Sequence, residues 1–270
     1  MIKGLLDAHV HTKMCHHATG EMYEYVESAI ALNLTTIGFS DHFPMFYLPK
    51  NIDTSSYCMN MNELPIYINE VKALQEKYTE IDIKIATEAD FITGKKTEIK
   101  ESLNKFEFDY VLGSVHVISN WCIDDPKNLQ KYNEIDISDI YRDYYSILKK
   151  AVDSRLFDIM AHLDLVKKFG FRPDEDMSSS IDPVIDSLKK NKICIELNTA
   201  GDRKPVKEFY PDRSILEKCY ENDIPISLGS DAHKPEEVAW KFDDALELIR
   251  DIGYTQLVKF SNRKKQFVDI

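Results

Sequence analysis

Seven short apolar segments, each followed by a longer amphipathic one, are the feature of this 270-residue sequence that most limits its fold. The apolar segments are often rich in β-branched residues, as buried parallel strands are. Between them apolar residues recur at helical spacing, as in "SSSIDPVIDSLKKN", which also has a plausible capped start. The predicted strands cover residues 4–10, 34–40, 82–90, 108–118, 156–164, 192–199 and 224–232, and the predicted helices cover 21–33, 62–79, 136–152, 178–191, 212–222 and 236–251.

This alternation predicts an α/β fold with a parallel sheet covered by helices. Seven units are one fewer than in the common eight-stranded barrel. We therefore expect a closed or nearly closed (β/α) barrel, distorted or with one strand unrecognised. The tail, "TQLVKFSNRKKQFVDI", is expected to add a short strand or to close the barrel. Because 43% of residues are hydrophobic and no linker or low-complexity tract is evident, a single domain over 1–270 is predicted.

All eight histidines lie at, or just after, the C-terminal end of a predicted strand. In a barrel these ends converge on one face, where active sites are built, so residues distant in the sequence meet there. Carboxylates and one amide occupy similar positions. The strand-end residues are His9 and His11, Asp41 and His42, Glu88, His116, His162 and Asp164, Asn198, and Asp231 and His233, with His16 and His17 on the loop after the first strand.

The spacing of these residues favours a metal centre. His9 and His11 are two positions apart, so their side chains leave the same face of a strand, and Asp231 and His233 repeat that spacing. Imidazole and carboxylate suit Zn²⁺, Fe and Mn²⁺. The candidate ligands exceed the needs of one ion, which predicts two or three divalent metals. A single histidine at a strand end is more simply a satisfied polar residue, but the shared position of all eight argues for ligands.

Four aspartates near these histidines have two open interpretations. Each of Asp7, Asp41, Asp90 and Asp164 could hydrogen-bond the imidazole of a ligand, or simply cap a turn.

Charge and cysteine content exclude several partners. The net charge of −12 repels nucleic-acid backbones and anionic membranes, and it also requires strong local cations for any phosphate chemistry. No apolar run approaches the roughly 18–20 residues of a membrane span. The five cysteines are odd in number and never in CxxC spacing. With no signal-peptide pattern, these features predict a cytoplasmic protein without a disulfide framework. The oligomeric state stays open.

Six short motifs together resemble the PHP family of metal-dependent phosphoesterases, over nearly the whole chain. They are "DAHVHT", "GFSDH", "TEAD", "GSVH", "AHLD" and "GSDAH". Two longer stretches, "HTKMCHHATG" and "ELNTAGDRKPVKEFYP" (196–211), are similar to patterns of the histidinol-phosphatase branch. The resemblance implies a distorted seven-stranded (β/α) barrel with a trinuclear metal cluster at the C-terminal ends of its strands.

The resemblance also implies a ligand set. The implied ligands are His9, His11, Glu88 and Asp231 for the first metal, Glu88, His116 and His162 for the second, and His17, His42 and His233 for the third. His16 has no implied role, and we interpret it as a loop residue lining the entrance.

Arg203 matches the arginine of the "GDRKP" segment, and the resemblance implies that its guanidinium binds the phosphate in a fork of hydrogen bonds. Without the motif, a surface ion pair would be the simpler interpretation. Lys204 is expected to help bind phosphate, and His42 and His233 are expected to contact the substrate. For Lys167 and Lys168, phosphate binding and a solvated face are both open.

The implied reaction is hydrolysis of L-histidinol phosphate to L-histidinol and phosphate, in histidine biosynthesis. A metal-supplied hydroxide would attack phosphorus in line, with Arg203 stabilising charge on the phosphoryl oxygens. The proton for the leaving group could come from water, His233 or Asp231. The cationic amine and the imidazole of the substrate should favour acidic or aromatic neighbours, for which Phe43, Phe46 and Tyr47 are candidates, although they could equally be lid packing.

Three alternatives compete. A PHP phosphoesterase could act on another phosphomonoester or a nucleotide, although the acidic chain has no basic stripe for nucleic acid. An amidohydrolase barrel also opens with HxH, but it usually has a metal-bridging lysine where this chain has "GSVH". A metal-binding protein without activity would leave Arg203 without a purpose.

Overall fold

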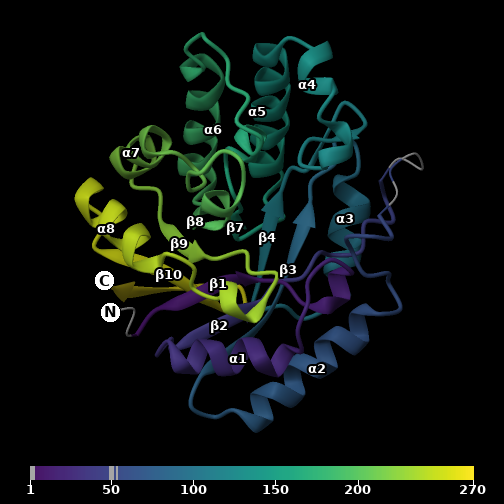
Figure 1. Ribbon diagram of the computed structural model, residues 1–270, viewed down its shortest axis with the longest axis vertical. Coiled ribbons are helices and arrows are strands. Elements are labelled where there is room, and N and C mark those ends of the chain that lie inside the picture. The colour runs from purple at the N-terminus through teal and green to yellow at the C-terminus, as the bar shows by residue number, and fades with distance from the viewer. Residues whose placement is uncertain (1–3, 49–51, 53) are drawn as a thin grey trace.

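The computed structural model describes residues 4–48, 52 and 54–270 of the chain. Its main sheet has the strand order β1-β2-β3-β4-β7-β8-β9, with every neighbouring pair parallel (Figure 1). The strands are β1 (Leu6–Val10), β2 (Thr36–Phe39), β3 (Asp82–Asp90), β4 (Tyr110–Ser114), β7 (Ile159–Met160), β8 (Cys194–Asn198) and β9 (Ile226–Gly229). Each lies within one of the seven predicted segments, so the predicted strand set is confirmed.

The barrel closes between its first and last strands only at one end. β1 and β9 form no continuous ladder, but Val10 makes an isolated parallel bridge with Ala232. The His11 amide donates to the Ala232 carbonyl at 2.9 Å, and the Asp231 amide donates to the His9 carbonyl at 2.7 Å. The predicted, nearly closed seven-stranded barrel is therefore confirmed. Its closing bonds involve the same residues that were singled out as metal ligands.

Helices cover the outside of the sheet (Figure 1). They are α1 (Met22–Ala31), α2 (Leu64–Lys77), α3 (Lys96–Leu103), α4 (Lys131–Glu134), α5 (Ile137–Ser154), α6 (Ser178–Asn191), α7 (Arg213–Glu221) and α8 (Phe242–Ile252). The prediction missed α3 and α4. Helix α4 is only four residues long, and α3 turns only Ile99, Ser102 and Leu103 into the protein. None of the helices in the described residues has the length and apolar character to cross a membrane.

The last predicted helix begins six residues later than expected. The segment before α8 forms a short 3-10 helix, η5 (Pro235–Glu237), followed by a turn. Ala239 and Lys241 have φ angles of 53° and 52°, in the left-handed region that an α-helix cannot include. This turn is tied to the barrel, because the Ala239 amide donates a 3.0 Å hydrogen bond to the buried carboxylate of Asp7 on β1.

The tail forms a separate hairpin and does not extend the barrel. β10 (Gln256–Ser261) and β11 (Lys264–Asp269) pair antiparallel. The Arg263 amide donates to the Asp109 carbonyl just before β4, at 2.8 Å, and the Phe260 ring lies 6.0 Å from that of Tyr110. The expected additional strand is thus present, but in a two-stranded sheet that covers the N-terminal end of the barrel, away from the strand ends that carry the histidines.

Replacing Phe260 by alanine should destabilise the fold, because this side chain is 2% exposed and closes the N-terminal end of the barrel. We expect the free energy of unfolding to fall by about 3–5 kcal/mol, measured by urea denaturation. Phe267→Ala on the same hairpin is the matched control, since that ring is 59% exposed, and it should cost less than about 0.5 kcal/mol. Equal losses of unfolding free energy in the two variants would show that packing of Phe260 against the barrel does not stabilise the fold.

Candidate metal centre

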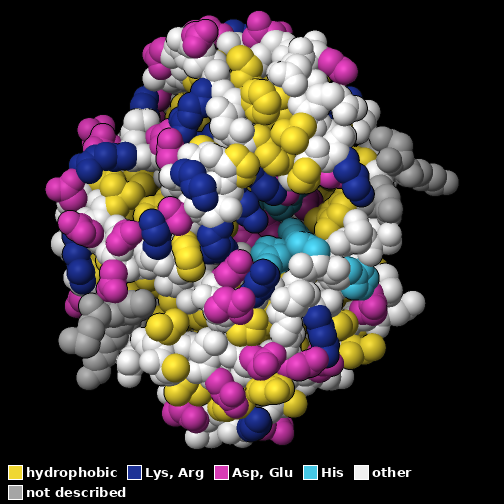
Figure 2. All heavy atoms as spheres, viewed as in Figure 1, with side chains coloured by type: hydrophobic (Ala, Val, Ile, Leu, Met, Phe, Trp, Pro, Cys, Tyr) yellow, Lys and Arg dark blue, Asp and Glu magenta, His cyan; other side chains and the backbone are white. Residues whose placement is uncertain are grey.

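A cavity of about 510 Å³ opens at the C-terminal ends of the strands. Figure 2 shows histidine side chains gathered in a hollow on this face, with lysine and arginine side chains close by. Eight of the nine residues expected to bind metal line the cavity, and the ninth, His9, is fully buried beside them. The eight are His11, His17, His42, Glu88, His116, His162, Asp231 and His233.

The first expected group meets where β1 and β9 close the barrel. The Nε2 atoms of His9 and His11 lie 3.0 Å apart, and Asp231 Oδ1 lies 3.2 Å from His11 Nε2. One oxygen of Glu88, Oε2, is 3.5 Å from each of these two nitrogens. Two imidazole nitrogens and two carboxylates therefore converge on one point.

The second expected group uses the other oxygen of Glu88. Glu88 Oε1 lies 2.9 Å from His162 Nε2 and 3.6 Å from His116 Nε2. Because its two oxygens face different sets of histidines, the Glu88 carboxylate has the arrangement of a bridging ligand.

The third expected group lies nearer the solvent. His17 Nε2 and His233 Nε2 are 2.8 Å apart, and ligand atoms of His17, His42 and His233 all lie within 4.8 Å of one another. Backbone carbonyls orient two of these rings: His17 Nδ1 is 2.9 Å from the Cys15 carbonyl, and His233 Nδ1 is 3.0 Å from that of Asp231. Each ring thus turns its Nε2 toward the other.

The carboxylates and imidazoles of this cluster shift one another's pKa. Burial alone would raise the pKa of the Glu88 carboxyl, but His42, His116 and His9 hold that pKa well below its usual range. The pKa of Asp231 is likewise held low against burial, by His9 and His11. Burial lowers the pKa of the His42 and His233 imidazoles, whereas neighbouring carboxylates raise the pKa of the His9, His11 and His116 imidazoles against burial. Because imidazoles coordinate metal only in their neutral form, we expect these three rings to release their protons when a metal binds.

A buried ring nitrogen supports cation binding at this place. Among the described residues, His42 Nδ1 is buried without a hydrogen bond of good geometry and lies 3.0 Å from Glu88 Oε2, where the other candidate ligands converge. Leaving buried polar atoms unpaired is costly, and an ion that coordinates such nitrogens removes that cost. The donor set, all imidazole and carboxylate, fits divalent transition-metal ions.

Two carboxylates outside the three groups orient ligand imidazoles. Glu196 Oε1 lies 2.7 Å from His9 Nδ1, and Asp90 Oδ2 lies 3.0 Å from His116 Nδ1. This is the arrangement in which a carboxylate directs a ligand histidine. For Asp90, this contact decides for the first of the two open interpretations, a hydrogen bond to the imidazole of a ligand. Glu196 was missed, although its alternation with Asn198 on β8 places the two side chains on one face.

The other three aspartates support the backbone around the site. Asp7 accepts the Ser230 and Ala239 amides, at 2.9 and 3.0 Å. Asp164 pairs with Lys167, and Asp41 accepts the Thr12 and His42 amides. Asp41 Oδ1 is also 3.5 Å from His11 Nδ1, so Asp41 partly fits both interpretations.

Arg203, in the 3-10 helix η4 (Ala200–Arg203), lies behind Asp231. Its Nη2 donates to the carbonyls of Ser230 and Asp231, at 2.8 and 3.0 Å. Arg203 is not one of the residues lining the cavity, so the expected grip on phosphate stays a prediction. The visible role of this side chain is to hold the backbone of Asp231, whose φ of 52° is strained for a non-glycine residue.

The three lysines have different places. Lys204 and Lys168 line the cavity. Lys167 is 1% exposed, pairs with Asp164 at 2.8 Å and donates to the Phe209 carbonyl at 2.8 Å. Both interpretations of Lys167 were therefore wrong. It belongs to η3 (Leu165–Lys167), which turns it into the protein and away from the cavity.

His16 stands apart from the three groups, as predicted, but it does not line the cavity. Its Nδ1 lies 2.7 Å from the Ser55 carbonyl, and its side chain is 36% exposed. A φ of 66° at the end of η1 (Lys13–Cys15) turns it away from His17.

The aromatic candidates for substrate recognition were wrong. Phe43 is fully buried in the core, and Tyr47 is buried with its hydroxyl on the Asp90 carbonyl. Phe46 is exposed, and none of the three lines the cavity. Packing of the chain after β2 directs these rings inward or to solvent, which a strand-end position alone did not reveal.

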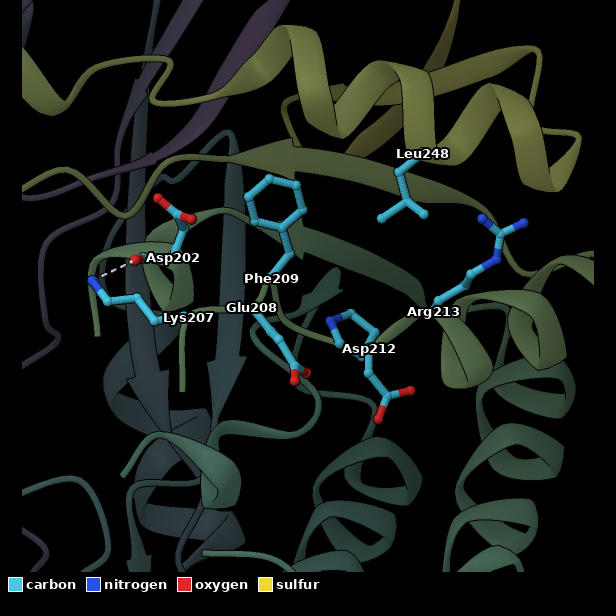
Figure 3. Close-up of a pocket in the computed structure, with 8 residues that line it drawn as sticks. Asp202, Lys207, Glu208, Phe209, Asp212, Arg213 and Leu248 are labelled. Carbon is cyan, nitrogen blue, oxygen red and sulfur yellow. Dashed lines mark hydrogen bonds between the residues drawn. The ribbon is translucent and has the colours of Figure 1, made fainter. Parts of the chain in front are cut away.

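A second hollow, of about 330 Å³, lies between the 202–213 loop and α8 (Figure 3). Its lining includes Asp202, Phe209, Arg213 and Leu248 and contains no histidine. Lys207 Nζ donates to the Asp202 carbonyl there, at 3.2 Å. The chemistry-bearing residues belong to the histidine cavity and not to this hollow.

A barrel with histidine and carboxylate ligands at its C-terminal strand ends defines the class of metal-dependent hydrolases. The sequence model of the PHP domain matches residues 7–200, and the chain belongs to this family. The chain is 40% identical to a probable histidinol-phosphatase of Deinococcus radiodurans, over 97% of this chain and 99% of that protein. It is 25% identical to the histidinol-phosphatase of Bacillus subtilis, over 89% and 98%.

A solved structure has the same fold. It is the histidinol phosphate phosphatase of Lactococcus lactis, complexed with zinc, L-histidinol and phosphate. It superposes with a TM-score of 0.81 at 25% identity, covering 97% of this chain and 98% of that one. The resemblance found in the motifs is thereby confirmed, in family and in fold.

Proposed function

We propose that this protein is a metal-dependent histidinol-phosphatase, which hydrolyses L-histidinol phosphate to L-histidinol and phosphate in histidine biosynthesis. The observation that carries the proposal is the Glu88 carboxylate, whose two oxygens face separate sets of histidines at the floor of a solvent-open cavity. The relatives from Deinococcus radiodurans and Bacillus subtilis, which match 97% and 89% of this chain, bear the same activity in their names.

The metal centre is proposed to hold two or three ions of zinc, iron or manganese. The residues that would hold them are His9, His11, His17, His42, Glu88, His116, His162, Asp231 and His233. When bound, divalent ions neutralise charge on phosphoryl oxygens and make water nucleophilic at neutral pH. Glu196 and Asp90 keep the His9 and His116 rings oriented for this task.

The chain supplies cations and proton acceptors at the cavity wall. Lys204 and Lys168 line the cavity and are proposed to contact the phosphate together with His42 and His233. Asp231 and His233 were expected to be catalytic, and both reach the cavity. Their side chains are proposed to take part in proton transfer during the reaction.

The test is substrate preference of the purified, metal-loaded protein, followed by phosphate release. We expect kcat/KM for L-histidinol phosphate to exceed that for nucleoside monophosphates by at least about tenfold, the effect of 1.4 kcal/mol of differential binding. A higher kcat/KM for nucleotides would assign the same metal centre to a different phosphoesterase. Absence of activity on every monoester, with metals bound, would remove the enzymatic proposal.

A further inference from the structure

One side of the cavity is built from residues that take no part in the metal groups. Asp124 follows the short hairpin of β5 (Val117–Ile118) and β6 (Trp121–Cys122), Lys168 follows η3, and Tyr57 comes from a turn before α2. We call these three residues the Asp124 wall. They reach the cavity from segments far apart in the sequence, and neither Asp124 nor Tyr57 lies at the end of a barrel strand.

Asp124 and Lys168 form an ion pair inside the cavity. Lys168 Nζ lies 3.1 Å from Asp124 Oδ2 and donates to the Asp124 carbonyl at 2.9 Å. The two side chains are 28% and 17% exposed, so both remain accessible to a ligand. In the described part of the chain, Oδ1 of Asp124 accepts no hydrogen bond. The carboxylate therefore keeps one oxygen for a cationic group that enters the cavity.

The other acidic side chains of the cavity outside the metal groups have partners of their own. Glu237 accepts the His233 amide at 2.9 Å and lies 3.6 Å from Arg203 Nε. Asp125 accepts the Lys127 amide at 2.9 Å, which caps the 3-10 helix η2 (Pro126–Asn128). Asp124 is thus the anion best placed to bind a ligand.

L-histidinol phosphate carries opposite charges at its two ends, a phosphate and an ammonium, with an imidazole beside the ammonium. The phosphate belongs at the metal groups, which leaves the ammonium and the ring to meet the rest of the cavity. We propose that Asp124 binds the ammonium of the substrate, on the side of the cavity that Tyr57 also lines. This inference rests on the proposed function and names the group that selects its substrate.

The ion pair explains how the cavity can accept both ends of the substrate. When the ammonium binds the free Oδ1 of Asp124, it weakens the attraction between Asp124 and Lys168, and the lysine becomes free to contact the phosphate. One ion pair of the free enzyme is then replaced by two with the ligand, so neither Asp124 nor Lys168 loses a partner. A phosphomonoester without a cationic group cannot make this exchange, because it would leave Asp124 unpaired, which is costly in a partly buried site.

The test is Asp124→Asn, which keeps the shape of the side chain and removes its charge. We expect kcat/KM for L-histidinol phosphate to fall roughly 10- to 100-fold, mostly through KM, as loss of a charge-assisted hydrogen bond predicts. For p-nitrophenyl phosphate, which has no ammonium, kcat/KM should stay within about threefold. Competitive inhibition by L-histidinol should weaken by the same factor by which kcat/KM for L-histidinol phosphate falls. Inhibition by inorganic phosphate should stay at its wild-type strength.

Asp125→Asn is the matched control, because it neutralises the neighbouring carboxylate, which caps η2; it should keep the preference of the wild type. If Asp124→Asn lowered kcat/KM equally for both substrates, or left inhibition by L-histidinol unchanged, the role of Asp124 would be overturned and the proposed function would stand. A wild-type protein that hydrolyses p-nitrophenyl phosphate but not L-histidinol phosphate would overturn the proposed function, and this inference with it.

Discussion

Replacing Glu88 by glutamine is expected to lower kcat/KM for L-histidinol phosphate about 10³-fold or more, with loss of bound metal. Its two oxygens lie within 4 Å of nitrogens of His9, His11, His42, His116 and His162. An amide cannot supply the negative charge that several cations share, and the several kcal/mol of charge stabilisation lost at the metal centre correspond to such a factor.

Metal content by elemental analysis and phosphate release, measured on the same preparation, check this expectation. Glu107→Gln serves as the control, because Glu107 is exposed in the loop before β4; it should leave both quantities unchanged. If Glu88→Gln kept its metals and its rate, the bridging arrangement seen in the structure would have no part in the reaction.

Replacing Arg203 by alanine is expected to lower kcat/KM about 100-fold, in line with the loss of a partly buried, charged hydrogen-bond donor. The physical reason is its pair of hydrogen bonds to the Ser230 and Asp231 carbonyls, which hold Asp231 in its left-handed conformation. Without them, the Asp231 carboxylate should move from its place 3.2 Å from His11 Nε2. Arg203→Lys should not restore activity, because an ammonium does not reproduce the planar fork.

Two further measurements separate positioning of Asp231 from direct binding of phosphate. If Arg203 positions Asp231, metal content should fall in Arg203→Ala, while inhibition by inorganic phosphate of the remaining loaded enzyme stays near the wild-type value. If Arg203 instead binds phosphate, metals should be retained and phosphate inhibition should weaken. Arg213→Ala is the control, since Arg213 is exposed and pairs only with surface carboxylates among the described residues. Wild-type activity in Arg203→Ala would exclude both roles.

Hydrophobic patterning predicted most of the fold. Buried parallel strands are short apolar runs, and amphipathic helices repeat their apolar residues every three to four positions. Both signals are local, so all seven strands and the helix over 178–191 could be located from them. The start of α8 could not be located from these signals. The turn before it is held by a hydrogen bond from the Ala239 amide to Asp7, more than 200 positions away in the sequence.

The site divides in the same way. The sequence by itself determined which side chains gather at one face, because parallel strands in a barrel deliver their C-terminal ends to the same place. That rule located His9, Glu88, Asp231 and their partners. Only the tertiary structure decided what surrounds them: Glu196 behind His9, Arg203 behind Asp231, and Asp124 in the cavity wall. These contacts join loops and long side chains from distant segments, and their directions are set by packing that no local pattern encodes.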